Sequence, residues 1–351
     1  METMVLQKNP FFILHADLTD DHAALQRKAS EAVLLEDTGE AEKALSNLLH
    51  PQKRLEAELM WFPETEDTEI EKLEAFCRAG EQPSRPDKVS DSHDGTGSQP
   101  SFPALPDFQT ESDLAMVNAC RCILGAWPAE YSEGLFGIGL CLAGALRGLT
   151  VDGVIAELNR AREVSGFPEI TNREMVGNHL MNLRESILGD FSNRMKKAKK
   201  GEAGKAASLL AEEYGRSDPL YEKNYYIQKM VETYMVTVSD QEKRQISEIS
   251  ERLKWSMKDS AMQALRDWDK LTGPRRKIKK AQGLTDEGSE NLIRSLSEYV
   301  DEKLAKKKLA ELLEAAKMLE VMLEVFWDVP EERLARHREV AERCGKLLKK
   351  R

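Results

Sequence analysis

Apolar side chains recur at steps of three and four residues over long stretches of this 351-residue chain. The stretch 241–271 shows the pattern most fully. Its steps drift as 3.6 residues per turn requires, which indicates packing in a globular bundle rather than in a strict coiled-coil seam. Aromatic residues make up only 6% and charged residues 32%, and this composition favours Leu/Ala/Glu/Lys-rich helices over sheets. The sequence therefore predicts an all-α protein.

The stretch 9–63 has the most specific order of residues in the chain. Pro10 opens a short apolar segment, and Thr19-Asp20-Asp21 supplies the oxygens that cap a helix N-terminus. A helix follows with Leu25 and Ala29 on its apolar face, and it breaks at 37–40. A second helix is interrupted by Pro51, and a third helical piece stops at Pro63. This order predicts a small helical hairpin domain over residues 1–63.

Two motifs in this stretch resemble J-domains, the co-chaperone modules that dock on Hsp70-type ATPases. NPFFIL (9–14) resembles the family's opening segment, and ALSNLLHPQKR (44–54) is similar to the end of its third helix and the exit that follows. The resemblance implies a co-chaperone-like adaptor that docks on an Hsp70-type ATPase or another protein partner. The residues it implies for docking are Arg27, Lys28, Asp37, Lys53 and Arg54.

The chain departs from the J-domain pattern in the loop between the two long helices. There the family carries a His-Pro-Asp tripeptide that stimulates ATP hydrolysis by the partner, whereas residues 34–40 read LLEDTGE. The resemblance therefore does not extend to that stimulation, and docking and a purely structural use of the hairpin both stay open. Any small helical hairpin gives a similar apolar pattern, so a chance likeness also stays open.

The composition changes after Pro63. Residues 64–111 are first acidic and then rich in Pro, Gly and Ser, with little to bury, which predicts a linker between domains. Residues 112–351 predict a larger bundle of about eight helices. In its most apolar segment, 131–149, Glu133 and Arg147 bracket a stretch shorter than the roughly 20 apolar residues of a membrane span. We therefore expect a buried central helix and no membrane partner.

A cationic run follows Gly273-Pro274, which we expect to end a helix and to place the run in a solvated loop. An alternative function, a nucleic-acid-associated factor, would use this run together with the basic segment 194–200. A net charge of −10 and the lack of interleaved aromatic residues make nucleic acid the less favoured partner. The residues of the run are Arg275, Arg276, Lys277, Lys279 and Lys280.

A heptad-like stripe over 289–327 predicts the longest helix, suited to a neighbouring helix or to homo-oligomerisation. The five cysteines show no disulfide or zinc spacing, and the first residues do not read as a signal peptide, so we expect reduced thiols and a cytoplasmic protein. The histidines are scattered, and phosphate-binding and nucleophile motifs are absent. We therefore expect a non-catalytic protein without cofactor or metal, and an enzyme built from residues far apart in sequence stays open as an alternative.

Overall fold

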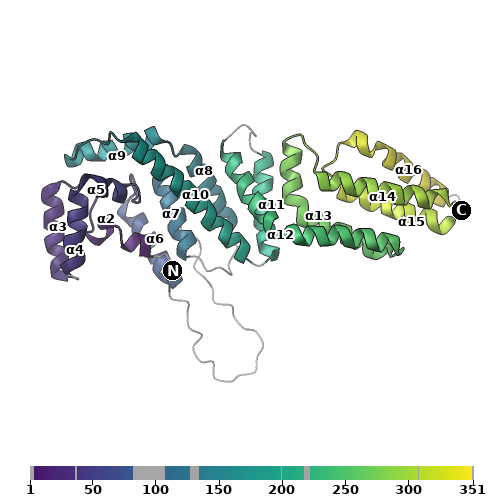
Figure 1. Ribbon diagram of the computed structural model, residues 1–351, viewed down its shortest axis with the longest axis horizontal. Coiled ribbons are helices and arrows are strands. Elements are labelled where there is room, and N and C mark those ends of the chain that lie inside the picture. Colours follow the sequence, from purple (N-terminus) through teal and green to yellow (C-terminus); the bar gives the residue numbers. More distant parts are fainter. Residues whose placement is uncertain are drawn as a thin grey trace, which may run out of the picture. The chain divides into compact units, whose positions relative to one another are not determined.

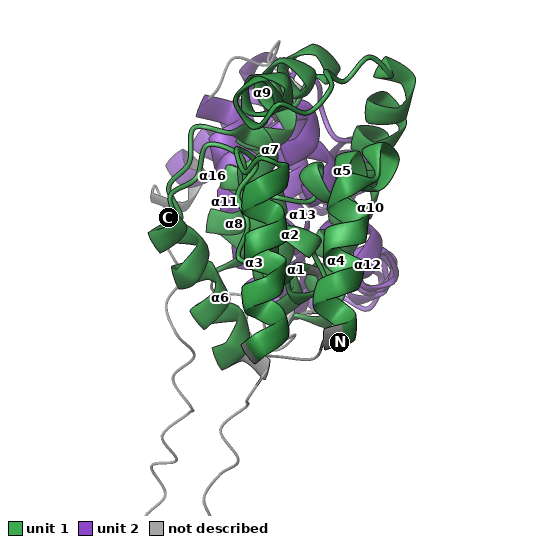
Figure 2. Cartoon of the chain, turned by 90° about the vertical axis from the view of Figure 1, so that its left-hand side faces the viewer, with its two compact units in different colours: residues 1–199 green, residues 200–351 purple. Residues whose placement is uncertain are grey.

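The computed structural model describes residues 4–35, 38–81, 107–126, 134–198, 200–216, 222–306 and 308–349. Within these ranges every regular element is a helix, which confirms the predicted all-α class (Figure 1). The chain divides into two compact units, residues 1–199 and residues 200–351, which Figure 2 colours separately.

Unit 1 begins with two one-turn helices and continues with longer ones. Two views show α3 and α4 side by side (Figures 1 and 2). Further along the chain, α6 packs on α7, and α7 packs on both α8 and α10. The helices are α1 (Met4–Gln7), α2 (Pro10–Ile13), α3 (His22–Leu35), α4 (Thr38–Leu49), α5 (Pro51–Glu58), α6 (Asp67–Glu81), α7 (Asp113–Ala126), α8 (Leu135–Gly148), α9 (Val151–Ser165) and α10 (Arg173–Lys197).

Local signals position several helix ends in unit 1. Pro51 separates α4 from α5 as predicted, and it is itself the first residue of α5. His50 is the N-cap residue, and its ring accepts from the Lys53 N–H. The Thr150 hydroxyl caps α9 by accepting from the Gly153 N–H. Gly166 ends α9 at φ 72°, in the left-handed region that favours glycine.

The units divide at residue 199 and not in the predicted linker 64–111. The first part of that segment forms α6, whose Leu73 is fully buried, and the Gln109 N–H donates to the Glu69 carboxylate over 3.1 Å. The acidic segment contains an amphipathic helix, with apolar residues at helical spacing, and this helix packs on α7. Residues 82–106, the Pro/Gly/Ser-rich part of the predicted linker, lie outside the described residues.

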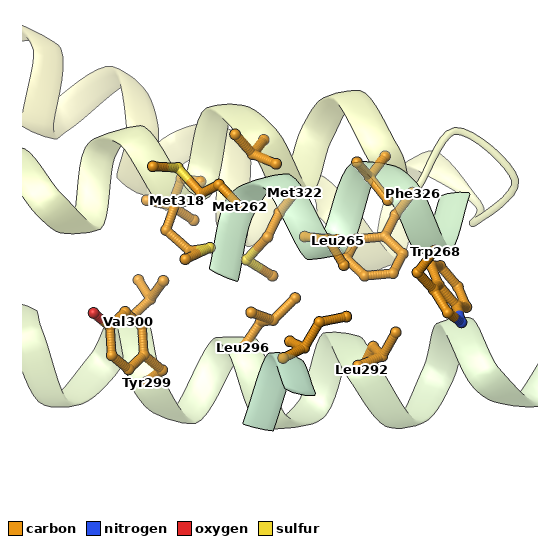
Figure 3. Close-up of a cluster of buried hydrophobic side chains, with 14 of the residues drawn as sticks. Met262, Leu265, Trp268, Leu292, Leu296, Tyr299, Val300, Met318, Met322 and Phe326 are labelled. Atoms are coloured by element: carbon orange, nitrogen blue, oxygen red, sulfur yellow. The ribbon is translucent and has the colours of Figure 1, made fainter. Parts of the chain in front are cut away.

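An apolar core in the described part of unit 2 draws side chains from α12 to α16. In Figure 3 the side chains of Leu292 and Leu296 point toward those of Leu265, Met322 and Phe326. The helices are α11 (Lys200–Arg216), α12 (Glu222–Lys254), α13 (Lys258–Ala281), α14 (Glu287–Ala305), α15 (Leu309–Val325) and α16 (Glu331–Lys349).

Two predicted helix boundaries in unit 2 are wrong. The single helix expected over 241–271 is two helices, α12 and α13, separated by a turn in which Ser256 has φ 55°. The longest helix expected over 289–327 is likewise two helices, α14 and α15. In both places the apolar stripe continues through the turn because both helices contribute to the same core, so the periodicity alone could not reveal the break.

The expected stop at Gly273-Pro274 is also wrong, because α13 continues through Pro274 to Ala281. Proline lacks a donor and crowds the preceding turn, which disfavours a helix interior. Here Pro274 is buried, and the turns after it are held by Arg276 and Ile278, which are also buried. Tertiary contacts outweigh the local preference at this position.

The predicted buried helix within 131–149 is α8, and Leu142 and Leu146 lie in the core of unit 1. Among the described residues no single helix has the length and apolar character to cross a membrane. The pair α8 and α9, bent by 86°, meets those two criteria only when both helices are taken together.

Candidate interaction surfaces

A buried ion cluster joins α5 to α9 in unit 1. The Glu58 carboxylate accepts from Arg54 Nε at 2.7 Å and from Arg162 Nη2 at 2.7 Å. The two guanidiniums also donate to backbone carbonyls, Arg54 to Leu18 and Arg162 to Pro168. All three charged side chains are buried, so the cluster fixes α5 against a segment about a hundred residues later.

Aromatic rings and burial complete the surroundings of Arg54. Its guanidinium carbon lies 3.5 Å from the centroid of the Phe167 ring and 5.4 Å from that of Phe11. Burial lowers the pKa of Arg54, against the opposing effect of Glu58. An arginine stays charged even so, which is why the neighbouring carboxylate and carbonyl oxygens are needed.

Two buried asparagines bind the carbonyls at the end of α5. The Asn9 amide donates to the carbonyls of Ala57 and Met60, and the Asn118 amide of α7 donates to those of Leu59 and Trp61. The last carbonyls of a helix have no partner within it, and side-chain donors can supply one. Residues 51–63 are therefore bonded both to the first residues of the chain and to α7.

The residues implied by the J-domain resemblance lie in different environments. Arg54 is buried in the ion cluster, so its prediction as a docking residue is wrong. Lys28 donates to the His15 carbonyl at 2.8 Å and to Asp20 at 2.7 Å, which ties α3 to the preceding turn. Arg27 and Lys53 are exposed, and Asp37 lies outside the described residues.

The outer side of α3 carries one exposed face, which we call the α3 face and define as Arg27, Glu31 and Leu34. These residues are four and seven positions apart, so they lie in one row along the helix. Arg27 makes no ion pair or hydrogen bond with another described side chain, and Leu34 is 84% exposed. An apolar side chain beside a free cation at the end of a helix can contact a protein partner.

The cationic run 275–280 lies in the last turns of α13, and the prediction of a solvated loop is wrong. Arg275 pairs with Glu242 at 2.7 Å and with Asp286 at 2.6 Å, and these hydrogen bonds raise its pKa although burial opposes them. Lys277 pairs with Glu212 and donates to the Ser208 hydroxyl. Lys280 donates to the Trp327 carbonyl, and the half-buried Lys279 completes the run.

Arg276 is completely buried and belongs to a second ion cluster. It pairs with Asp269 at 2.6 Å and with Asp328, and it donates to the Val325 carbonyl. The buried and paired members of the run stabilise the fold of unit 2. Arg276 cannot contact a phosphate because it is buried. Arg275 and Lys277 could do so only by breaking their ion pairs.

The other basic segment, 194–200, is also largely helical. Arg194, in the last turn of α10, donates to the Gly125 carbonyl at 3.1 Å. Lys196 and Lys197 are exposed, and Lys199 lies outside the described residues. The segment offers separate exposed lysines rather than the continuous basic stripe that a phosphate backbone favours.

Unit 2 exposes a group of large apolar side chains that we call the end patch, defined as Trp255, Met257, Leu309 and Leu313. Trp255 is 78% exposed, in the turn between α12 and α13, and the two leucines lie one turn apart at the start of α15. Most positions of the predicted 289–327 stripe are buried within unit 2, and Leu309 and Leu313 are the large apolar residues of that range that stay exposed.

Charge contacts place the two halves of the end patch at the same end of unit 2. Glu314 of α15 faces Lys258, the first residue of α13. Lys303, near the end of α14, pairs with Glu311 at 3.1 Å and with Glu314 at 3.0 Å. Exposed lysines flank the patch, and they are Lys254, Lys306 and Lys308.

Five cysteines lie in the described ranges and form no disulfide with one another, and they are Cys77, Cys120, Cys122, Cys141 and Cys344. Burial raises the pKa of Cys120 far above its ordinary value and that of Cys122 to about 12. A thiol is nucleophilic only as the thiolate, so neither thiol is activated as a nucleophile. Cys120 is buried in the core and Cys122 is half-buried. Within the described ranges, no three His, Cys, Asp or Glu side chains converge as metal ligands would.

Comparison of the chain with protein-family models, with curated proteins and with solved structures found no match in any of the three. Its function is therefore inferred from the contacts within this chain.

Proposed function

We propose that the protein is a non-catalytic adaptor that docks on an Hsp70-type ATPase through the α3 face. The observation that carries the proposal is the exposure of Leu34, the most exposed of the large apolar side chains in the described part of the chain. It lies in one row with Arg27, whose charge has no partner among the described side chains. The J-domain resemblance of residues 9–14 and 44–54 supports the choice of partner class.

The end patch supports a second contact, as an adaptor requires. Trp255 and Met257 offer an exposed apolar surface in unit 2, and the flanking lysines favour a partner that carries acidic residues. We assign this patch to a client protein with exposed apolar segments. Because the loop 34–40 has no His-Pro-Asp tripeptide, we expect docking without stimulation of ATP hydrolysis.

Binding of the full chain to a purified Hsp70-type ATPase in ATP, followed by biolayer interferometry, tests the docking contact. Leu34→Ser and Arg27→Glu each lower the affinity at least about tenfold, which corresponds to about 1.4 kcal/mol. Two matched controls leave it unchanged: Val164→Ser, an exposed apolar residue on α9, and Lys43→Glu, an exposed cation on α4. Absence of binding by the unaltered chain, or equal binding by the Leu34 and Arg27 variants, rejects the proposal.

A second experiment separates the client contact from docking. Reduced and carboxymethylated α-lactalbumin serves as a permanently unfolded client. Trp255→Ser lowers capture of the α-lactalbumin by the chain and leaves binding of the ATPase unchanged. Leu34→Ser lowers binding of the ATPase and leaves capture of the α-lactalbumin unchanged. If both variants lower both activities equally, the two patches do not act as separate contacts and the assignment of the end patch fails.

A further inference from the structure

Helices α11, α12 and α13 line a groove of about 660 Å³ in unit 2, which we call the α11–α13 groove. Its polar lining includes Lys205 of α11, Tyr234 and Gln245 of α12, and Lys270 of α13. Val238 and Leu271 contribute apolar surface. Small-molecule sites have volumes in this range and combine apolar surface with a few converging polar groups, as this groove does.

Tyr234 is the most informative residue of the groove. The residue is 3% exposed and lines the groove, and its hydroxyl makes no hydrogen bond to any described residue. The hydroxyl can therefore bond to a molecule in the groove without leaving another partner. Burial raises the pKa of this phenol, so it stays protonated and can donate. The hydroxyl oxygen lies 3.1 Å from the position that a Cβ on Gly204 would take, and the glycine therefore keeps the approach to the phenol open.

Two lysines of the groove also lack partners. Lys205 and Lys270 are exposed, and neither forms an ion pair with a described carboxylate, whereas Lys277 on the same helix as Lys270 pairs with Glu212. The one carboxylate in the lining, Asp267, accepts a hydrogen bond from Gln263 at 3.0 Å. The groove thus has more positive than negative charge in a chain whose net charge is −10.

An unused acceptor lies among these donors. The side-chain carbonyl oxygen of Gln245 is buried and has no hydrogen-bond partner. It can accept a hydrogen bond from a hydroxyl or an amine. The groove therefore offers two ammonium groups and a phenol O–H to an anion, one carbonyl oxygen to a donor, and the apolar surface of Val238 and Leu271 to a carbon skeleton. Ser208, Gln241 and Asp267 complete its polar lining.

We propose that the α11–α13 groove binds a small molecule that carries a phosphate group, with Lys205, Lys270 and Tyr234 contacting the phosphate and Gln245 accepting from a hydroxyl of the ligand. A phosphate monoester carries a charge of about −1.5 to −2 and three acceptor oxygens, which matches two point charges and a hydroxyl donor. A carboxylate would be matched better by the planar fork of an arginine, and none lines the groove. This site is independent of the docking contact on α3.

Isothermal titration of the full chain with glycerol 3-phosphate, and separately with inorganic phosphate at matched ionic strength, tests the proposal. Lys205→Gln with Lys270→Gln is expected to lower the affinity at least about tenfold, and Tyr234→Phe several-fold. Tyr234→Phe keeps the ring and removes only an unpaired hydroxyl, so it preserves the fold. Lys254→Gln and Tyr225→Phe, which lie outside the groove, serve as controls with unchanged affinity.

The two probes distinguish the source of the phosphate. Tighter binding of glycerol 3-phosphate supports an ester whose skeleton uses Gln245 and the apolar surface, and Gln245→Leu then reduces the difference between the probes. Equal binding of both probes, still sensitive to the lysines, supports a site for free phosphate. Binding of neither probe, or the same affinity in the groove variants and the controls, overturns the proposal.

Discussion

The two units bury ion clusters of opposite composition. In unit 1 two guanidiniums, from Arg54 and Arg162, share the single carboxylate of Glu58. In unit 2 the single guanidinium of Arg276 is shared by two carboxylates, from Asp269 and Asp328. Both clusters include aromatic rings, and Arg276 lies 4.7 Å from the Trp268 ring centroid.

The groups around each cluster compensate for its excess charge. In unit 1 the extra N–H donors reach carbonyl oxygens, those of Leu18 and Pro168. In unit 2 the extra acceptors receive donors: the Ser289 hydroxyl donates to Asp328, and the Trp327 indole donates to Asp269. Each buried charge thus has an opposite charge and further hydrogen bonds, although Arg54 Nη1 and Arg276 Nε have no partner among the described residues. Equal numbers of both signs are not required.

The largest effect is expected when the shared group of unit 1 is removed. Glu58→Ala leaves two buried guanidiniums without a carboxylate, and we expect it to lower the free energy of unfolding of unit 1 by about 4 kcal/mol. Chemical denaturation followed by hydrogen exchange of the α5 and α9 amides measures the loss. Glu163→Ala, an exposed glutamate on α9, is the control. A loss below about 1 kcal/mol would show that the cluster behaves as a surface pair.

Asp328→Asn is expected to lower the free energy of unfolding of unit 2 by less, about 3 kcal/mol. The loss is smaller because Arg276 keeps its contacts with Asp269 and the Val325 carbonyl. The loss appears as faster hydrogen exchange in α13 to α16, with α3 to α5 unaffected. If this variant proves more destabilising than Glu58→Ala, then the number of carboxylates per guanidinium does not decide the energy of these clusters, and the comparison fails.

Each unit also contains one partly buried histidine whose pKa is lowered from 6.5, and this predicts a pH dependence. Burial and then Arg121 lower the pKa of His179 in unit 1, and burial and then Arg336 lower that of His337 in unit 2. The unfolded chain binds these protons first as pH falls, so the stability is complete above pH 6.5 and declines below it toward the folded pKa. The slope per histidine is up to about 1.4 kcal/mol per pH unit.

Denaturant midpoints between pH 7.5 and 5 measure this dependence. His179→Gln should flatten the decline in unit 1 only, and His337→Gln the decline in unit 2 only. An unchanged decline in both variants would assign the acid sensitivity to other groups, such as Glu314, whose pKa is lowered by hydrogen bonds from Tyr299 and Lys303 against the opposing effect of burial.

The smallest effects concern helix ends. Gly166 in unit 1 and Gly283 in unit 2 end their helices at φ 72°, whereas Ser256 ends α12 at φ 55°. We expect Gly166→Ala and Gly283→Ala to destabilise by about 1 kcal/mol each and Ser256→Gly to stabilise by a similar or smaller amount. Shifts in the denaturant midpoint measure all three, and a destabilising Ser256→Gly would show that the serine side chain has its own role at this turn.

Local chemistry predicted a good part of the helical boundaries. The starts of α5 at Pro51 and of α9 after Thr150 follow from residues adjacent in sequence, because a missing donor or a capping oxygen acts within one turn. The side chain of Asn172 caps α10 in the same way, by accepting from the Met175 N–H. At Pro274 the local signal gives the wrong boundary, because buried tertiary contacts of Arg276 and Ile278 stabilise the helix beyond the proline.

The candidate site residues were harder to predict. Arg54 and Arg276 each lie in a basic stretch that reads as a surface, and both are buried. The partner that decides the environment of Glu58 is Arg162, 104 residues away, and sequence periodicity holds no information at that separation. Arg27 could be identified as exposed because its neighbours Leu25 and Ala29 define the opposite, buried face of α3.

The sequence by itself determined the helical class and many of the helix ends, because apolar spacing and capping depend on residues within a turn or two. Only the tertiary structure decided which charges are buried, where the units divide and which apolar side chains are left exposed, because each of these depends on segments that are distant in the chain and adjacent only in the fold.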